Sequence, residues 1–294
     1  MSRQFFAPGK VVVIGEYAVT DGAPAIVAAV DHGVAVRWTS GPSVEIHTPG
    51  GDDRFVAAAL RAVGSPPGRW TFEDQPARRS ADKPGLGGSA AATVVATFAA
   101  MALAHPASPP DRAAVWRLAA RVHFEVQGSG SGVDVAASAW GGFCRFELGA
   151  PPAPVPATPL SVVWSGASAA TGPRLAAYRA WPQRHRFVDE SRALTHAFAA
   201  DPIAATRASR RLLEAMAADA GLDYRTPALD HLADLAERHG GAGKPSGAGG
   251  GDCLVALLPD PDARAAFEAA ARRDGFGVID ARLSSGVHER TQAA

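Results

Sequence analysis

Three glycine-rich segments hold the residues whose types and spacing could do chemistry. They read Lys83-Pro-Gly-Leu-Gly-Gly-Ser-Ala-Ala91, Gln127-Gly-Ser-Gly-Ser-Gly-Val-Asp-Val-Ala-Ala137 and Gly243-Lys-Pro-Ser-Gly-Ala-Gly-Gly-Gly-Asp-Cys253. Closely spaced glycines let backbone N–H groups approach a ligand without obstruction by Cβ atoms. Each segment is therefore a candidate for contact with phosphate or another small anion.

The first segment leads directly into an alanine-rich helix predicted over residues 89–103. The unpaired N–H groups and the positive dipole end of that helix would face the loop, which suits a triphosphate. Ser89 could offer its hydroxyl to Mg²⁺. The structural alternative is a tight turn with Ser89 as the helix N-cap, although one turn does not need so many glycines. The pattern matches neither the Walker nor the dinucleotide-binding motif.

The second segment delivers one carboxylate, Asp134, to the start of a helix predicted over residues 133–139. Two interpretations stay open at this point. Ser131 and Asp134 have the spacing of a capping box, with Asp in place of the usual Glu. A glycine loop that carries one carboxylate into a pocket also suits a general base beside an acceptor hydroxyl.

The third segment holds seven glycines over residues 240–251 and precedes an apolar strand predicted over residues 254–258. A flexible linker is one interpretation. Such linkers are seldom followed at once by a buried strand, so we favour a loop that lies against bound phosphates.

The lysines form a second pattern. Lys and Arg together number 29, yet the lysines are Lys10, Lys83 and Lys244, each within three residues of a glycine. Chance in a glycine-rich chain is one explanation. The other is that these positions need a compact ammonium instead of a planar guanidinium. On that view Lys83 faces phosphate and Lys244 orders the third segment.

The elements that must position these residues mix strands and helices without regular alternation, which favours an α+β fold over a doubly wound parallel sheet. Apolar and β-branched runs predict strands over residues 11–14, 24–38 (broken at 31–33), 70–72, 143–146, 160–164, 254–258 and 276–283. Apolar periodicity predicts helices over residues 52–63, 89–103, 111–126, 133–139 and 262–273, and a mostly helical span over 174–239. Residues 149–159, with five prolines, resemble a linker.

Composition sets the class of protein. The chain has 294 residues, zero formal net charge and 47% hydrophobic residues, so we expect a globular protein with no nucleic-acid or membrane partner. No long uncharged apolar run is present, and the N-terminus lacks the apolar core of a secretion signal. Cys144 and Cys253 form no metal-ligand spacing, which favours a cytoplasmic protein.

Several spaced motifs, in a fixed order, resemble those of the GHMP kinase superfamily. They are Ala7-Pro-Gly-Lys-Val-Val-Val-Ile-Gly-Glu-Tyr17, Pro84-Gly-Leu-Gly-Gly-Ser-Ala-Ala91, Gly130-Ser-Gly-Val-Asp134, Trp140-Gly-Gly142 and Ser246-Gly-Ala-Gly-Gly-Gly-Asp252. The resemblance implies an N-terminal domain over residues 1–159 with a left-handed β-α-β unit. It also implies a ferredoxin-like C-terminal domain over residues 160–294, with the site between the two, in a monomer or a homodimer.

The resemblance also implies roles. Asp134 would take or orient the proton of the acceptor, and Lys10 would hold Asp134 and the migrating phosphoryl group. ATP would contact Lys83, Pro84, Gly85, Leu86, Gly87, Gly88, Ser89 and Ala90, with Ser89 also on Mg²⁺. The acceptor would contact Lys10, Gly15, Glu16, Tyr17, Ser131, Gly132, Asp134, Ser246, Gly247, Ala248 and Gly249.

Within the superfamily the sequence most resembles phosphomevalonate kinases. The segments that carry this likeness are residues 15–19, 130–137, 164–171 and 244–253. Two positions depart from superfamily patterns. Gly88 stands where a Ser is common, and His123 stands where mevalonate kinases supply a Glu to Mg²⁺, with Glu125 two residues on. The second departure disfavours mevalonate kinase.

The expected reaction is therefore ATP plus 5-phosphomevalonate giving ADP plus 5-diphosphomevalonate, in the mevalonate route to isoprenoids. The alternatives are a mevalonate kinase, another small-molecule kinase of the superfamily, or a catalytically silent regulatory protein. Bringing two anionic phosphates together needs cations beyond Mg²⁺. Candidates for an arginine on the acceptor phosphate are Arg145, Arg186 and Arg192.

Overall fold

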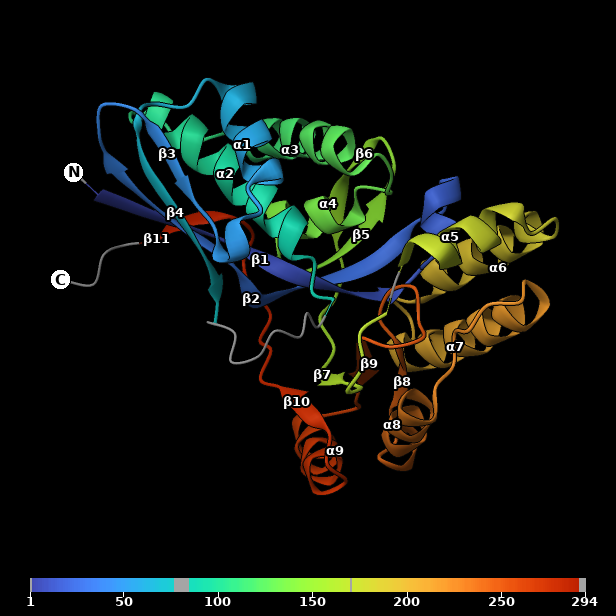
Figure 1. Cartoon of the computed structure of the whole chain (residues 1–294). Helices are drawn as coiled ribbons and strands as arrows, with labels where there is room; N and C mark the ends of the chain where they lie inside the picture. The colour runs from blue at the N-terminus through green and yellow to red at the C-terminus, as the bar shows by residue number, and fades with distance from the viewer. Residues whose placement is uncertain (1, 77–84, 170, 291–294) are drawn as a thin grey trace.

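A computed structural model describes residues 2–76, 85–169 and 171–290 of the chain (Figure 1). It has two β-sheets, each with its own set of helices, and the α+β class is confirmed. No helix in these ranges is both long and apolar enough to cross a membrane.

The first sheet has seven strands among the described residues, in the order β11-β1-β2-β4-β3, with β5 paired to β2 and β6 paired to β5. Its strands are β1 (Ser2–Ile14), β2 (Ala25–Ser40), β3 (Val44–His47), β4 (Gly68–Gln75), β5 (Phe143–Glu147), β6 (Ala150–Pro154) and β11 (His288–Arg290). β3 and β4 are parallel neighbours joined by a helix, which makes a β-α-β unit.

Four helices cover one face of this sheet (Figure 1). They are α1 (Arg54–Val63), α2 (Gly88–Ala104), α3 (Arg112–Gln127) and α4 (Val133–Trp140). α2 is apolar on almost every side because it packs against the sheet and against the three other helices. Its alanine side chains permit this close packing, and a hydrogen bond from Lys10 N–H to the Leu86 carbonyl oxygen holds the segment before the helix beside β1.

The second sheet, within the described part of the chain, has four antiparallel strands in the order β10-β7-β9-β8. The elements are β7 (Leu160–Trp164), α5 (Thr171–Ala180), α6 (Arg184–Ala197), α7 (Pro202–Asp219), α8 (Pro227–Arg238), β8 (Ala242–Pro245), β9 (Cys253–Leu257), α9 (Pro261–Arg273) and β10 (Gly277–Ile279). Along the chain these elements follow the order strand, helices, two strands, helix and strand. This chain order, combined with the strand order β10-β7-β9-β8, is the expected ferredoxin-like arrangement.

Two local predictions need correction. Residues 31–33 do not end the second strand, which runs from Ala25 to Ser40, but its pairing with β1 shifts register there, from Gly9 opposite Val30 to Ala7 opposite Val34. Gly33 lets β2 pass so close to β1 that a Cβ there would lie 2.0 Å from the Ala7 carbonyl oxygen. The Asp31 carboxylate is satisfied by the Arg282 N–H at 2.9 Å. Residues 150–154 of the predicted linker form β6, an edge strand on β5, where prolines are tolerated.

We expected the domains to divide between residues 159 and 160. β7 begins at Leu160, and the other strands of the second sheet follow it. After β10 the chain returns to the first sheet, where β11 pairs with β1. An apolar cluster joins the two sheets through Val11 and Val13 of β1 and Val255 and Leu257 of β9. This packing sets β1 against the third glycine-rich segment.

Candidate active site

Lys10 lies near the middle of β1, directly beneath the first glycine-rich segment. Its backbone N–H donates to the Leu86 carbonyl oxygen at 2.9 Å. Gly9 makes this approach possible, because a Cβ there would lie 2.5 Å from the same oxygen. The Lys10 side chain runs under Gly87, whose added Cβ would lie 3.1 Å from Lys10 Cγ. Lys10 is only 7% exposed, so its ammonium has little freedom to move.

The first glycine-rich segment wraps the N-terminus of α2, as predicted. Gly85 and Gly87 have positive φ angles, and Gly87 precedes the helix without any side-chain cap. Gly85, Leu86, Gly87, Gly88 and Ser89 line a cavity of about 550 Å³ between α1, β4 and α2. Ala90 is buried in the core behind them. Lys83 and Pro84 lie outside the described residues.

Ser89 is not the helix cap that the structural alternative required. Gly87 occupies the N-cap position, and the Ser89 hydroxyl lies 3.2 Å from Nε2 of His123 on α3. The His123 ring stacks on Phe55, with centroids 5.0 Å apart and planes 29° apart. Burial lowers the pKa of His123 below its ordinary value.

Asp134 lies in the first turn of α4 and faces Lys10. Its Oδ1 is 3.4 Å from Lys10 Nζ, and its side chain is 35% exposed. Gly132 is the N-cap of α4, and no side chain caps this helix, so the capping interpretation of Asp134 is wrong. The Ser131 hydroxyl accepts a long hydrogen bond from Val133 N–H at 3.4 Å. Asp134 is therefore free to face a ligand with one side and Lys10 with the other.

The turn after β1 carries Glu16 and Tyr17. Gly15 has a φ of 102°, and a Cβ there would lie 2.6 Å from Ala25 Cα. Glu16 is 4% exposed and forms an ion pair with Lys244. Its Oε2 is buried and has no hydrogen-bond partner among the described residues. The Tyr17 hydroxyl donates to the Ala248 carbonyl oxygen at 2.6 Å, and burial raises its pKa.

The third glycine-rich segment is a fixed loop, so the linker interpretation is wrong. The Ser246 hydroxyl accepts a hydrogen bond from the Val12 N–H at 2.9 Å. Gly249 packs on Tyr224, where a Cβ would lie 2.2 Å from a ring carbon. At its start the Lys244 ammonium donates to Glu16 and to the Pro245 carbonyl oxygen. Burial lowers the pKa of Lys244, and the Glu16 carboxylate opposes this shift.

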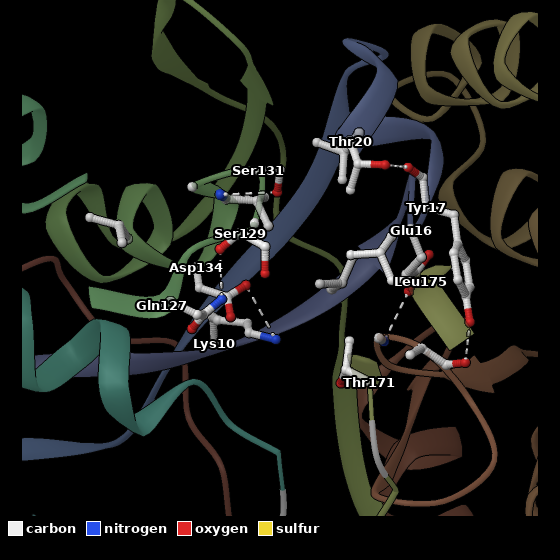
Figure 2. Close-up of a pocket in the computed structure, with 18 of the residues that line it drawn as sticks. Lys10, Glu16, Tyr17, Thr20, Gln127, Ser129, Ser131, Asp134, Thr171 and Leu175 are labelled. Carbon is white, nitrogen blue, oxygen red and sulfur yellow. Dashed lines mark hydrogen bonds and ion pairs between the residues drawn. The ribbon is translucent and has the colours of Figure 1, made fainter. Parts of the chain in front are cut away.

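These segments enclose a second cavity of about 500 Å³ (Figure 2). Lys10, Gln127, Ser129, Ser131 and Asp134 lie on one side, and Glu16, Tyr17, Thr20, Thr171 and Leu175 lie on the other. Gly132, Gly247 and Ala248 also line this cavity. Gln127 lines both cavities, so the two are neighbours. They also meet at Lys10 and Asp134, because Gly87 lines the first cavity and its added Cβ would lie 3.1 Å from Lys10 Cγ and 3.7 Å from Asp134 Oδ2. Ser89 of the first cavity contacts His123 of the second.

Several residues that were predicted to contact the acceptor do not line either cavity. Ser246 and Gly249 support the loop and do not line either cavity, and Gly15 lies behind Glu16. Neither cavity, in the part of the chain described, is lined by Arg145, Arg186 or Arg192. Arg186 pairs with Glu190 at 2.7 Å on the exposed face of α6.

Sequence reasoning missed three features of the site. These are the hydrogen bond of Ser89 to His123, the stack of His123 on Phe55, and the burial of Glu16 with one oxygen unpaired. The signal for the first was that His123 stands where mevalonate kinases supply a Glu to Mg²⁺. The second and third depend on residues far apart in the chain and had no local signal.

The sequence matches two family descriptions. Residues 78–142 match the GHMP kinases N terminal domain, and residues 203–276 match GHMP kinases C terminal. A phosphomevalonate kinase of Streptomyces sp. strain CL190 is 30% identical, over 95% of this chain and 96% of that protein. The chain belongs to the GHMP kinase family. A mevalonate kinase of Thermococcus sibiricus is 28% identical, over 88% of this chain and 90% of that one.

The fold of this GHMP kinase also occurs in solved structures. A Streptococcus pneumoniae phosphomevalonate kinase in complex with phosphomevalonate and AMPPNP has a TM-score of 0.82 and 19% identity, covering 97% of this chain and 100% of that one. GHMP kinases are phosphotransferases, and the glycine-rich segments of this member line both cavities of its site.

The metal-binding side chains near the two cavities of this GHMP kinase are few, which suits a Mg²⁺ ion held mainly by a nucleotide. No group of three or more His, Cys, Asp or Glu residues in the described ranges could hold a metal ion. Among the described residues, the Ser89 hydroxyl lines the first cavity and the Asp134 carboxylate lines the second, and both are oxygen donors. Mg²⁺ commonly binds through one or two protein oxygens together with phosphates and water, so these residues fit the ion.

Proposed function

We propose that this GHMP kinase transfers the γ-phosphoryl group of ATP to 5-phosphomevalonate, giving ADP and 5-diphosphomevalonate in the mevalonate pathway. The observation that carries the proposal is the junction of two cavities at the ion pair of Lys10 and Asp134. The 30% identity to a phosphomevalonate kinase over almost the whole chain supports the choice of acceptor.

ATP binds in the cavity between α1, β4 and α2. Its phosphates lie along residues 85–89, where backbone N–H groups and the positive end of the α2 dipole favour anions. Lys83 and Pro84 precede these residues in the sequence, and we propose that they take part in the same binding. Ser89, near the junction of the cavities, offers its hydroxyl to Mg²⁺.

The acceptor binds in the cavity between α4 and the turn after β1. Glu16 lines this cavity, and its buried Oε2 has no hydrogen-bond partner among the described residues. A small movement of the side chain would let this oxygen accept a hydrogen bond from a hydroxyl group of the acceptor. Ser131 and the backbone at Gly132 and Gly247 border the same cavity. A hydroxylated acceptor with an anionic end near Lys10 satisfies both the unpaired carboxylate oxygen and the ammonium.

Catalysis rests on positioning and charge neutralisation. A phosphate acceptor is already largely ionised near neutral pH, so a strong base is less necessary. Lys10 lies between the cavities and neutralises the oxygens that approach one another. Asp134 holds the Lys10 ammonium and orients any proton that remains on the acceptor. Bound Mg²⁺ would neutralise charge on the nucleotide phosphates.

Mevalonate is the second candidate acceptor. Among the described residues, Lys10 is the single Lys or Arg whose side chain lines the acceptor cavity. A single ammonium suits one transferring phosphoryl group better than it suits two phosphates. Asp134 would then act as a general base on the mevalonate hydroxyl. A catalytically silent protein is disfavoured, because Lys10, Ser89 and Asp134 are all retained at the junction.

A coupled ADP-release assay over mevalonate, 5-phosphomevalonate and homoserine separates these functions. We expect 5-phosphomevalonate to exceed the other two in kcat/KM by at least tenfold, which is about 1.4 kcal/mol of transition-state stabilisation. Asp134→Asn, nearly isosteric, is the control for a contaminating kinase. A higher kcat/KM for mevalonate would refute the choice of acceptor. No acceptor-dependent ADP with any of the three would refute the kinase proposal for these substrates.

A further inference from the structure

The Ser89 hydroxyl has one hydrogen-bond partner within the described residues, and that partner is the imidazole of His123 at 3.2 Å. The carbonyl oxygen of Ser89 is used differently, since it accepts from the Thr93 hydroxyl at 2.8 Å within α2. In the neutral tautomer of His123 that carries its proton on Nδ1, the Ser89 hydroxyl donates to Nε2 and its proton points toward the ring.

His123 is held firmly in this position. It is 7% exposed, and its ring stacks on Phe55, a residue that lines the nucleotide cavity. His123 itself lines the acceptor cavity. The ring thus forms part of the wall between the two cavities, and stacking limits its rotation away from Ser89.

A neutral hydroxyl can bind a cation only through a lone pair, and its proton must then point elsewhere. An imidazole nitrogen that accepts this proton leaves both Ser89 lone pairs available on the other side. A carboxylate at the same position would instead compete for the cation. The neighbouring carboxylate on α3 cannot do so, because Glu125 is solvent-exposed and lies 4.0 Å from Arg121 on the outer face of the helix.

We propose that His123 is a positioning residue whose unprotonated Nε2 accepts a hydrogen bond from the Ser89 hydroxyl and so turns a Ser89 lone pair toward the cation of a bound metal–nucleotide. His123 is not itself a metal ligand in this arrangement. The inference rests on the proposed position of Mg²⁺ and ATP beside Ser89, and it does not depend on which acceptor is used.

The test uses AMPPNP and Mg²⁺ with the full chain, measured by titration calorimetry. His123→Phe retains an aromatic ring for the stack on Phe55 but removes the acceptor nitrogen. His123→Gln loses the ring but offers an amide oxygen that can accept the hydroxyl proton. We expect the apparent Mg²⁺ affinity in the presence of AMPPNP to fall roughly tenfold or more in His123→Phe, the range for partners that orient a metal ligand. His123→Gln should recover most of this loss.

The affinity for AMPPNP without Mg²⁺ separates positioning from a merely structural role. It should be the same in the parent, in His123→Phe and in His123→Gln. Ser89→Ala retains His123 and its stack, and it should reproduce the Mg²⁺ shift of His123→Phe, so the proposal can be tested even if that variant folds poorly.

Parent-like Mg²⁺ affinity in His123→Phe or in Ser89→Ala would overturn the proposal. Equal loss of AMPPNP affinity with and without Mg²⁺ in His123→Phe would also overturn it, in favour of a structural role. If the parent chain fails to bind AMPPNP at any Mg²⁺ concentration, the proposed nucleotide site is wrong, and the inference falls with it.

Discussion

Lys10→Arg tests whether the site needs an ammonium in one position or only a positive charge. The Lys10 stem is covered by the first glycine-rich segment, where an added Cβ on Gly87 would lie 3.1 Å from Cγ and 3.2 Å from Cε. The ammonium lies 3.4 Å from Asp134 Oδ1. The broader planar guanidinium cannot occupy this space without displacing either Gly87 or Asp134.

We expect Lys10→Arg to lower kcat at least tenfold, which corresponds to about 1.4 kcal/mol of lost transition-state stabilisation. Lys10→Met, which also removes the charge, should lower kcat further. Arg186→Lys is the matched control, because the Arg186 side chain is 87% exposed and pairs with Glu190 on the same helix, away from both cavities. That control should leave kcat and the melting temperature unchanged.

The assay is acceptor-dependent ADP release, with thermal melting to confirm that each variant is folded. In a parallel experiment, ATP and the acceptor should protect Lys10 from an amine-reactive reagent more than they protect the N-terminal amine. Parent-like kcat in Lys10→Arg, together with no protection of Lys10, would refute the positional role. The scarcity of lysine in the chain would then need no functional explanation.

Three further outcomes are expected. Asp134→Ala should lower kcat by roughly 10²–10⁴ with little change in nucleotide affinity or melting temperature, since Asp134 caps no helix; a stable, fully active variant would contradict its role. Lys244→Met should lower the free energy of unfolding in urea by about 3–5 kcal/mol, because Glu16 is left buried and unpaired. Adding Glu16→Gln should restore part of that loss, and no recovery would mean that packing dominates. Burial raises the pKa of the Cys144 thiol to about 12, so thiol reagents at pH 8 should label it only after unfolding.

Local sequence patterns predicted most elements that position the site. Apolar periodicity predicted the helices that became α1, α2, α3, α4 and α9, because each has its own stripe or run of apolar residues. The ferredoxin-like sheet was expected from the family resemblance, because local patterns predicted strands only over residues 160–164, 254–258 and 276–283 and missed β8 at the start of the third glycine-rich segment. The predicted contact of Lys10 with Asp134 is present at 3.4 Å.

Two predictions failed for different reasons. Asp31 and Gly33 predicted a break, but β2 continues through a register shift there, supported by the Arg282 N–H and by the close approach of β1. Residues 150–154 were predicted to be a linker because of their prolines, but an edge strand that pairs with β5 on one side only tolerates prolines. The partners of Asp31 and Gly33 lie far away in the sequence, whereas β5 directly precedes β6 and the prolines hid this local hairpin.

By itself the sequence determined which residues can do the chemistry, because glycines before helix starts and rare lysines in turns are local properties of the chain. Only the tertiary structure decided how they are used. Glu16 and Lys244 are separated by 228 positions, and Ser89 and His123 by 34, yet each pair is in contact. Those contacts exist because β1 packs on β9 and α2 packs on α3, and packing between elements depends on the whole fold.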